Sequence, residues 1–306
     1  MSKDTVSGGR RIQLGWFKGE FAERAAAIVE GREPPAAVRD ASTVVIVRPG
    51  PDPSPKSGDP RGGTGGIAPP GAVQILMMKR PGTMKFAAGA YVFPGGRVDE
   101  ADSDPRIGWH GTPQEEFAAL LGGSPEQARA LVVAAVRETY EESGILLAGS
   151  PDGQTVVPDG PEWDADRAAI RAGGLSFPDL LVKHGLVILA DRIVPWARWI
   201  TPVAEPRRYD TRFFAAIVPE GQTVDGHLAE ADKIAWVAPA AGLDAARAGE
   251  IMLLPPTSAT LSEFSAAGDV GDFLRQQRAI TPIQPRILIE DGEAWLEVPD
   301  GVPYPL

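Results

Sequence analysis

The sequence predicts an α/β fold, in which helices lie on both faces of a mixed β-sheet. Two observations carry this prediction: short β-branched and apolar runs recur along the chain, and helical patterns lie between several of them. Mixed strands with helices between them pack as layers around one core. With 306 residues, 43% of them hydrophobic, the chain can bury a full core.

The first elements are a short amphipathic helix predicted over residues 17–30 and a β-branched strand at 43–47. Residues 49–71 are too rich in Gly and Pro to pack, so we expect a mobile loop there. A phosphate-binding loop is disfavoured because no Gly-Lys-Ser/Thr follows the glycines. A strand resumes at 73–79, and its pairing with 43–47 would make the loop the tip of a hairpin.

Further elements follow downstream, and no internal repeat is visible. Strands are predicted at 91–93, 186–190, 212–218, 233–237, 287–289 and 294–298. Helices are predicted at 125–142, 241–248 and 257–265. We therefore expect an N-terminal extension (1–40) and one domain (41–306), which ends in a C-terminal extension (266–306).

The helix at 125–142 has clear end signals. Ser124 is typical of an N-cap and Pro125 of the first helical position, and Gln127 would complete a capping box. Gly144 supplies the stop.

One face of this helix is acidic: at about 100° per residue, Glu138, Glu141 and Glu142 share it. The opposite face is apolar and consists of Val132, Val133, Val136 and Tyr140. Carboxylates three and four positions apart repel each other, and acids in a last turn oppose the helix dipole. A solvated face is the ordinary alternative, but two broken local rules at one place indicate a bound cation. Hard divalent cations such as Mg²⁺ prefer oxygen ligands.

Residues 93–102 and 137–145 together resemble the motif of the Nudix hydrolases. That motif reads Gly, five residues, Glu, seven residues, Arg-Glu, an aliphatic residue, any residue, Glu-Glu, any residue, Gly and an aliphatic residue. Gly96 matches its first Gly, and Arg137-Glu138-Thr139-Tyr140-Glu141-Glu142-Ser143-Gly144-Ile145 matches its second half. Asp102 stands six positions after Gly96, as in the coenzyme A diphosphatase branch, and Thr139 replaces an aliphatic residue of similar shape.

An insertion splits the motif. Residues 103–136 separate its halves, 34 residues where the uninterrupted motif has seven, and we assign 103–124 to the insertion. The interruption resembles the branch of peroxisomal coenzyme A diphosphatases and related bacterial proteins. Pieces of resemblance extend from about residue 42 to 265, in Trp199-Ile200-Thr201-Pro202, Tyr209-Asp210-Thr211-Arg212-Phe213-Phe214 and Leu254-Pro255-Pro256-Thr257. The resemblance implies the Nudix fold, a mixed sheet between helices.

The family motif also implies roles for its residues. Glu138, Glu141 and Glu142 would be catalytic residues and, with the carbonyl of Gly95, ligands of Mg²⁺ or Mn²⁺. Structural support of the site would come from Gly96, Asp99, Asp102 and Arg137, with the arginine pinning the acidic helix to the turn through either aspartate. A further catalytic acid usually follows the motif, and the candidates are Glu230, with Asp232 and Glu220 as rivals, or else solvated loop acids.

Substrate recognition is less well defined by the sequence. Basic residues that flank the expected site are candidates for binding the extra phosphate of coenzyme A, namely Lys79, Arg80, Lys85, Arg207 and Arg208. The ordinary alternative for each is a solvated surface charge. Four aromatic residues could stack an adenine or simply belong to the core: Trp196, Trp199, Phe213 and Phe214. The insertion, which contains Trp109 and Phe117 and can form a short helix, is a candidate wall of the pocket.

Composition restricts the class of partner. No cysteine is present, which excludes disulfides and thiolate metal sites, and the three histidines are too scattered to suggest a zinc site. A net charge of −11 argues against nucleic acid as the main partner. Residues 1–11 lack an apolar signal core and no run is long enough to span a membrane, so we expect a cytoplasmic protein without a membrane partner. The oligomeric state stays open, with a homodimer as one expectation.

These observations predict a divalent-metal-dependent hydrolase of a small-molecule diphosphate. The resemblance implies coenzyme A or acyl-coenzyme A as the leading substrate, with 3',5'-ADP and (acyl-)phosphopantetheine as products. Another nucleoside diphosphate derivative, such as ADP-ribose or a dinucleotide, is the alternative substrate. A Nudix-fold sensor or binding module without catalysis is a third reading, disfavoured because every acid of the motif is present.

Overall fold

The computed structural model describes residues 10–14, 20–50, 73–82, 88–224, 233–267, 270–276, 278–290 and 293–305. Most of the loop predicted at 49–71 lies outside these residues. The helices are α1 (Glu20–Val29), α2 (Gln114–Leu121), α3 (Pro125–Ser143), α4 (Pro161–Arg171), α5 (Phe177–Lys183), α6 (Pro239–Arg247), α7 (Pro255–Ser265) and α8 (Val270–Leu274). The strands are β1 (Arg10–Gln13), β2 (Val38–Pro49), β3 (Val73–Lys79), β4 (Ala90–Val92), β5 (Gly95–Arg97), β6 (Gly108–His110), β7 (Ala148–Gly149), β8 (Val187–Leu189), β9 (Val194–Ile200), β10 (Arg208–Ile217), β11 (Lys233–Val237), β12 (Met252–Leu253), β13 (Pro282–Ile283), β14 (Arg286–Glu290) and β15 (Glu293–Val298).

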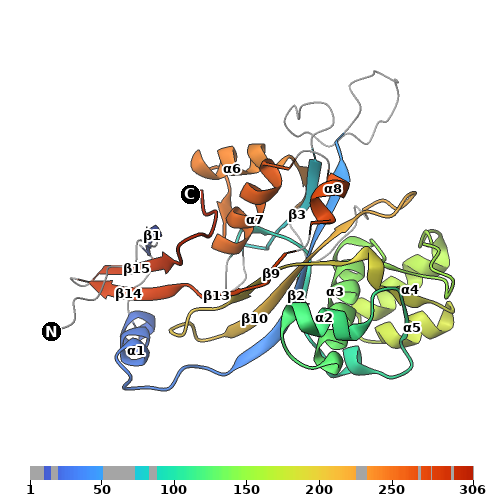
Figure 1. The fold of residues 1–306 in the computed structure, drawn as a ribbon, viewed down its shortest axis with the longest axis horizontal. Coiled ribbons are helices and arrows are strands. Elements are labelled where there is room, and N and C mark those ends of the chain that lie inside the picture. Colours follow the sequence, from blue (N-terminus) through green and yellow to red (C-terminus); the bar gives the residue numbers. More distant parts are fainter. Residues whose placement is uncertain are drawn as a thin grey trace.

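The main sheet has the order β12-β4-β3-β2-β10-β9-β13, with β11 paired to β3 and β5 paired to β2 (Figure 1). It is mixed, because β2 runs parallel to β10 and antiparallel to β3. Val47 is paired with Ile75, which confirms the predicted pairing of the strands on either side of the Gly/Pro-rich segment.

Two layers of helices enclose this sheet, with α6 and α7 on one face and α3 on the other (Figure 1). The alternation of side chains along β2 explains the two cores. Val44 and Ile46 pack with α3, whereas Val45 and Val47 pack with α6 and α7. The predicted α/β fold with helices on both faces is confirmed.

A smaller unit lies beside α3 and is built from the insertion and the segment after α3. Here β6, β8 and β7 form a three-stranded sheet, with α2, α4 and α5 around it (Figure 1). In the insertion, the rings of Trp109 and Phe117 meet edge to face with centroids 6.0 Å apart. Phe117 is buried in α2 and packs in the same core as α3, so the insertion has its own apolar anchor.

The two ends of the described chain meet in a third sheet of order β1-β15-β14, with α1 beside it (Figure 1). The predicted extensions are therefore joined to each other, while the domain boundaries themselves stay a prediction. None of the described helices combines the length and apolarity that a membrane crossing requires.

The aromatic residues considered for adenine stacking belong to the core. Trp196, Trp199, Phe213 and Phe214 are all buried in the two clusters that flank the sheet. The alternative that they serve packing is the one the structure favours.

Candidate active site

The acidic helix α3 has the end structures that its sequence indicates. The side chain of Ser124 accepts a hydrogen bond from the Gln127 amide, and Gly144 ends the helix in the left-handed conformation with φ of 78°. The predicted capping box is wrong. The Gln127 side chain instead donates a hydrogen bond of 2.7 Å to Asp40 of β2. That bond fixes the first turn of α3 to the sheet.

The carboxylates of α3 lie against the turn that leads from β4 into the first two residues of β5, here called the Gly95-Gly96 turn. Glu138 and Glu141 are 14% and 23% exposed. Glu142 Oε2 accepts a hydrogen bond of 2.7 Å from the Gly95 amide. The opposite helix face, including Val132, Val136 and Tyr140, is buried, as its apolar pattern predicts. The second half of α3 thus presents its acids to the Gly95-Gly96 turn.

Both glycines of this turn are required by close packing. A Cβ atom on Gly96 would collide with the carboxylate of Glu138. A Cβ atom on Gly95 would collide with the carbonyl of Ser42 and the side chain of Thr43. The missing side chain of Gly96 therefore lets the turn approach the acidic helix, and that of Gly95 lets the turn pack against β2.

Arg137 connects the acidic helix to the segment after the turn. Its guanidinium donates to both carboxylate oxygens of Asp102, at 2.8 and 3.0 Å, and to Glu138 at 2.8 Å. Asp102 is fully buried, whereas Asp99 lies 3.9 Å from the guanidinium. Of the two partners expected for Arg137, Asp102 makes the close bidentate contact.

The environment raises the pKa of two of the acids. Burial is the largest cause for Glu138, opposed by the adjacent Arg137. Burial also raises the pKa of Glu141 to about 7. Desolvated carboxylates with one arginine among them fit a divalent cation, because oxygen donors and unneutralised charge are what such an ion requires. Their ligating oxygens do not all converge: Glu138 is turned toward Arg137 and Glu142 toward Gly95.

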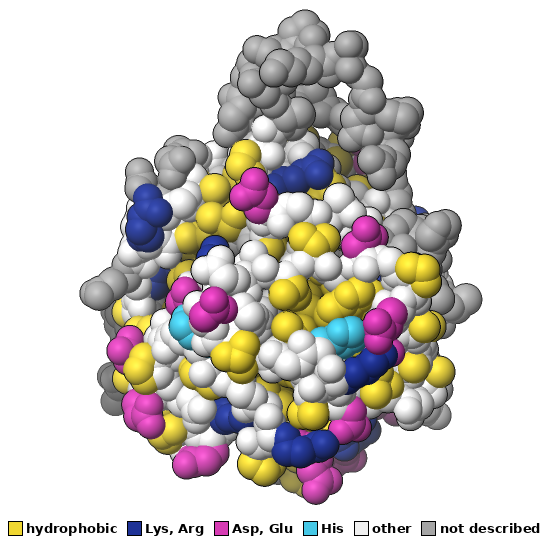
Figure 2. All heavy atoms as spheres, turned by 90° about the vertical axis from the view of Figure 1, so that its right-hand side faces the viewer, with side chains coloured by type: hydrophobic (Ala, Val, Ile, Leu, Met, Phe, Trp, Pro, Cys, Tyr) yellow, Lys and Arg dark blue, Asp and Glu magenta, His cyan; other side chains and the backbone are white. Residues whose placement is uncertain are grey.

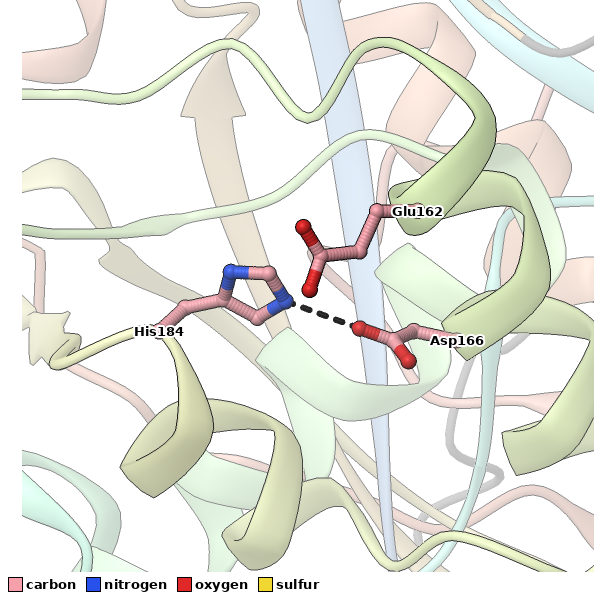
Figure 3. A group of neighbouring side chains, drawn as sticks. All are labelled: Glu162, Asp166 and His184. Carbon is pink, nitrogen blue, oxygen red and sulfur yellow. Dashed lines mark hydrogen bonds and ion pairs between the residues drawn. The ribbon is translucent and has the colours of Figure 1, made fainter.

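A second group of ligating side chains, which sequence analysis did not find, consists of Glu162, Asp166 and His184 (Figure 3). Their ligating atoms lie within 4.8 Å of one another, and His184 Nε2 is 2.8 Å from Asp166 Oδ2. The ammonium group of Lys183 lies 2.7 Å from Asp166 and 3.0 Å from Glu162. Because this lysine already pairs with both acids, the group is a structural ion-pair network that joins α4 to α5.

The predicted substrate-binding residues have different surroundings. Arg80 follows β3, and its buried Nε has no hydrogen-bond partner. Arg207 is exposed. Arg208 is buried and donates to the carbonyls of Thr201 and Ala36, an environment that favours a structural role over phosphate binding.

Several other candidates lie outside the described residues: Lys85, Glu230 and Asp232. Their roles stay predictions. Glu220 is described and exposed, just after β10.

On the face that carries α4 and α5, Lys and Arg side chains are interspersed with Asp and Glu (Figure 2). Charges of both signs alternate there without a continuous basic patch. This face therefore lacks the footprint that a nucleic-acid backbone requires.

The comparisons with known proteins agree with this geometry. Residues 113–263 match the family model described as "NUDT19 Nudix domain". The chain is 30% identical over 220 residues to "Putative nudix hydrolase 7" of Caenorhabditis elegans, which covers 72% of this chain and 65% of that protein. It is 28% identical over 272 residues to "Acyl-coenzyme A diphosphatase NUDT19" of Gallus gallus, which covers 74% of this chain and 68% of that protein.

A solved structure is also similar. The crystal structure of a NUDIX hydrolase from Alicyclobacillus acidocaldarius superposes with a TM-score of 0.62 at 26% identity, over 80% of this chain and 99% of that chain. The chain described here spans slightly less than two thirds, 65%, of the length of the nematode relative.

Proposed function

We propose that this chain, which belongs to the Nudix hydrolase superfamily, hydrolyses the diphosphate linkage of coenzyme A or acyl-coenzyme A. The products would be 3',5'-ADP and (acyl-)phosphopantetheine. The observation that carries the proposal is the acidic half of α3 against the Gly95-Gly96 turn, with Glu142 bonded to the Gly95 amide. The choice of substrate rests on the names of relatives such as the Gallus gallus acyl-coenzyme A diphosphatase.

In this proposal Glu138, Glu141 and Glu142 hold Mg²⁺ or Mn²⁺, with the Gly95 carbonyl as a further ligand. The bound ion would neutralise phosphate oxygens and lower the pKa of a water molecule. Arg137 holds the helix in register with the turn through its bidentate contact to Asp102.

Arg80 is the residue we assign to the substrate diphosphate. Its buried Nε has no hydrogen-bond partner among the described residues, so a phosphate oxygen would satisfy a donor that these residues leave unpaired. Arg207 and Lys85 are further candidates for the same anion. The acid that receives the proton of the attacking water is Glu230 in this proposal, with Asp232 and Glu220 as alternatives. The protein would act in the cytoplasm, and its oligomeric state stays open, with a homodimer as one expectation.

The test is product analysis by mass spectrometry. Wild-type protein with Mg²⁺ is incubated separately with coenzyme A, dephospho-coenzyme A, ADP-ribose and a dinucleoside polyphosphate. We expect 3',5'-ADP from coenzyme A and loss of turnover with EDTA. A higher kcat/KM for ADP-ribose would contradict the coenzyme A assignment and leave another nucleoside diphosphate as the substrate.

The variant Glu142→Gln belongs in the same experiment. It keeps the shape of the side chain and removes its charge, so we expect a folded protein whose turnover falls by about 100-fold or more. Glu115→Gln, at an exposed position on α2, is the matched control and should behave like wild type. Near-normal turnover by Glu142→Gln would refute the proposed metal site.

A further inference from the structure

A stacked arginine lies on the same face of the sheet as the acidic helix. The guanidinium carbon of Arg48, near the end of β2, is 4.2 Å from the ring centroid of Trp236 on β11. Arg48 Nε donates to Gln74 on β3, the strand between them, at 2.9 Å. The arginine side chain therefore extends across β3 and lies over the indole ring.

The direction of these side chains follows from the alternation along the strands. Ile46 of β2 and Leu76 of β3 are buried in the core cluster that contains α3, and Trp236 packs against that cluster. Arg48 is two positions after Ile46, so it belongs to the same sheet face. This face continues past the C-terminal end of α3, where the acids lie.

The strand register places the stack within reach of a substrate held at the acids. Gly95 of β5 is paired with Thr43 of β2. Trp236 of β11 is paired with Leu76 of β3. The pairing of Val47 with Ile75 places Leu76 beside Ile46 of β2. Three residue levels and one or two strand spacings separate Gly95 from Trp236, roughly 11 to 14 Å. A nucleoside diphosphate with its terminal groups has comparable length.

The charge of Arg48 is not compensated by a described carboxylate. Its guanidinium interacts with the Trp236 ring and with Gln74, and its side chain is half-buried. Burial lowers its pKa from the ordinary value, as expected for a cation without an acidic partner. Gln74 accepts from one of its five N–H donors, and the two terminal nitrogens have no acceptor among the described residues.

We propose that Arg48, held over Trp236, binds a phosphate group on the nucleoside end of the substrate, at a distance from the diphosphate that is cleaved. This inference rests on the proposed function, since it concerns the second anion of the same substrate. Arg48 is the residue that would distinguish a 3'-phosphorylated adenosine from its unphosphorylated form. Trp236 and Gln74 are positioning residues, because they orient the guanidinium plane.

Binding of the nucleotide product tests the inference without hydrolysis. Isothermal titration calorimetry compares adenosine 3',5'-bisphosphate with adenosine 5'-monophosphate, in the presence of Mg²⁺, on wild type and Arg48→Gln. We expect wild type to bind the bisphosphate about 10- to 100-fold more tightly, the effect of one lost charge-assisted contact. In Arg48→Gln this difference should disappear, with monophosphate binding unchanged within about threefold.

Two variants sharpen the comparison. Arg247→Gln removes an exposed arginine from α6, on the opposite face, and should keep the full difference. Arg48→Lys retains the charge but not the planar stack, so an intermediate difference is expected, and it also tests the site should Arg48→Gln fold poorly. A persistent preference for the bisphosphate in both Arg48 variants would overturn the proposal, as would equal or absent binding of the two nucleotides by wild type.

Hydrolysis assays separate this result from the proposed function. If wild type cleaves coenzyme A while both Arg48 variants keep their preference for the 3'-phosphate, the function stands and the subsite falls. If Arg48 governs bisphosphate binding but no diphosphate is cleaved, the subsite stands and the proposed reaction falls.

Discussion

At the scale of single residues, the candidate site is a cluster of carboxylates around one arginine of α3. Arg137 contacts Asp102 and Glu138 closely, and its Nη1 also lies 3.5 Å from a carboxylate oxygen of Glu141. Burial raises the pKa of Glu138 and Glu141 because their charged forms lose hydration. Such a cluster is costly in the free protein, and a cation that binds it would recover that cost.

The first prediction at this scale concerns Gly96. In Gly96→Ala the new Cβ would collide with the Glu138 carboxylate, which must move away from the turn. We expect kcat/KM to fall at least about 10-fold with little change in circular dichroism, because misplacement of a catalytic group costs far more in rate than in stability. Gly174→Ala is the control, since its nearest neighbour is the Ala169 carbonyl at an ordinary 3.6 Å. Equal activity of the two variants would contradict the assigned role.

The second prediction concerns pH. Burial raises the pKa of Glu141 to about 7 from the ordinary 4.5, so the folded state binds more protons than the unfolded state between these values. The contribution of Glu141 to the free energy of unfolding therefore falls as the pH rises from about 4.5 to 7. Urea unfolding with EDTA at pH 5 and pH 8 should show a larger loss in wild type than in Glu141→Gln. Parallel losses in both proteins would show that Glu141 titrates normally.

At the scale of elements, sequence patterns predicted the main layers well. Each predicted strand and helix exists, with ends shifted by a few residues, because runs such as 43–47 and 73–79 are both β-branched or apolar and bounded by Gly and Pro. The unpredicted β9 contains Pro195 and Arg198, which mask its strand pattern. The unpredicted α4 carries five charged residues among its eleven and is anchored by the buried side chains of Ile170 and Arg167.

The candidate site also has features that the sequence predicted and features that it did not. The helix caps and the acidic face could be read locally, since they depend on residues within one helix. The Arg48–Trp236 stack and the ion-pair network of Lys183 could not, because each brings together side chains from different elements. Gln127 shows the same limit: its local pattern predicts a capping box, but a carboxylate of β2 offers a stronger partner.

A network of buried ion pairs connects strands β2, β9 and β10 with helices α2 and α3. Arg212 of β10 is 2% exposed, and its Nη1 lies 2.7 Å from Asp40 of β2 and 3.0 Å from Asp210. Arg198 of β9 binds the same Asp210 and also donates to the Leu121 carbonyl at the end of α2. Because Asp40 also accepts from the α3 residue Gln127, the network ties the insertion and α3 to one part of the sheet.

The third prediction follows from this network. Arg212→Met leaves Asp40 and Asp210 with reduced compensation, so we expect a loss of about 3 kcal/mol in the free energy of unfolding. Urea unfolding measures it. Arg247→Met, which breaks an exposed pair with Asp244, should cost less than about 1 kcal/mol. Similar losses in the two variants would mean that the buried network contributes little.

At the scale of the whole molecule, the sheet between two helical layers separates the chemistry from the chain ends. The acids of α3 lie on one face, α6 and α7 cover the other, and the sheet β1-β15-β14 lies away from both the insertion and α4 (Figure 1). From the sequence, the N-terminal and C-terminal extensions could be recognised only as segments that lie outside the residues resembling the family. Their pairing depends on contacts across nearly the full chain, which no local pattern reports.

The last prediction uses this separation. Deleting residues 1–14 removes β1, its ladder with β15, the Leu14–Ala294 backbone bond of 2.8 Å and the bond from Arg10 to the Tyr304 carbonyl. At about 1 kcal/mol for each lost bond, we expect a destabilisation of a few kcal/mol and a lower Tm, while kcat stays near wild type because α3 and its turn are untouched. Deleting residues 1–9 alone keeps β1 and is the matched control. Differential scanning calorimetry and steady-state kinetics on both truncations decide the matter: a fall in kcat at unchanged Tm would mean that the paired ends contribute to the active site instead of stabilising the fold.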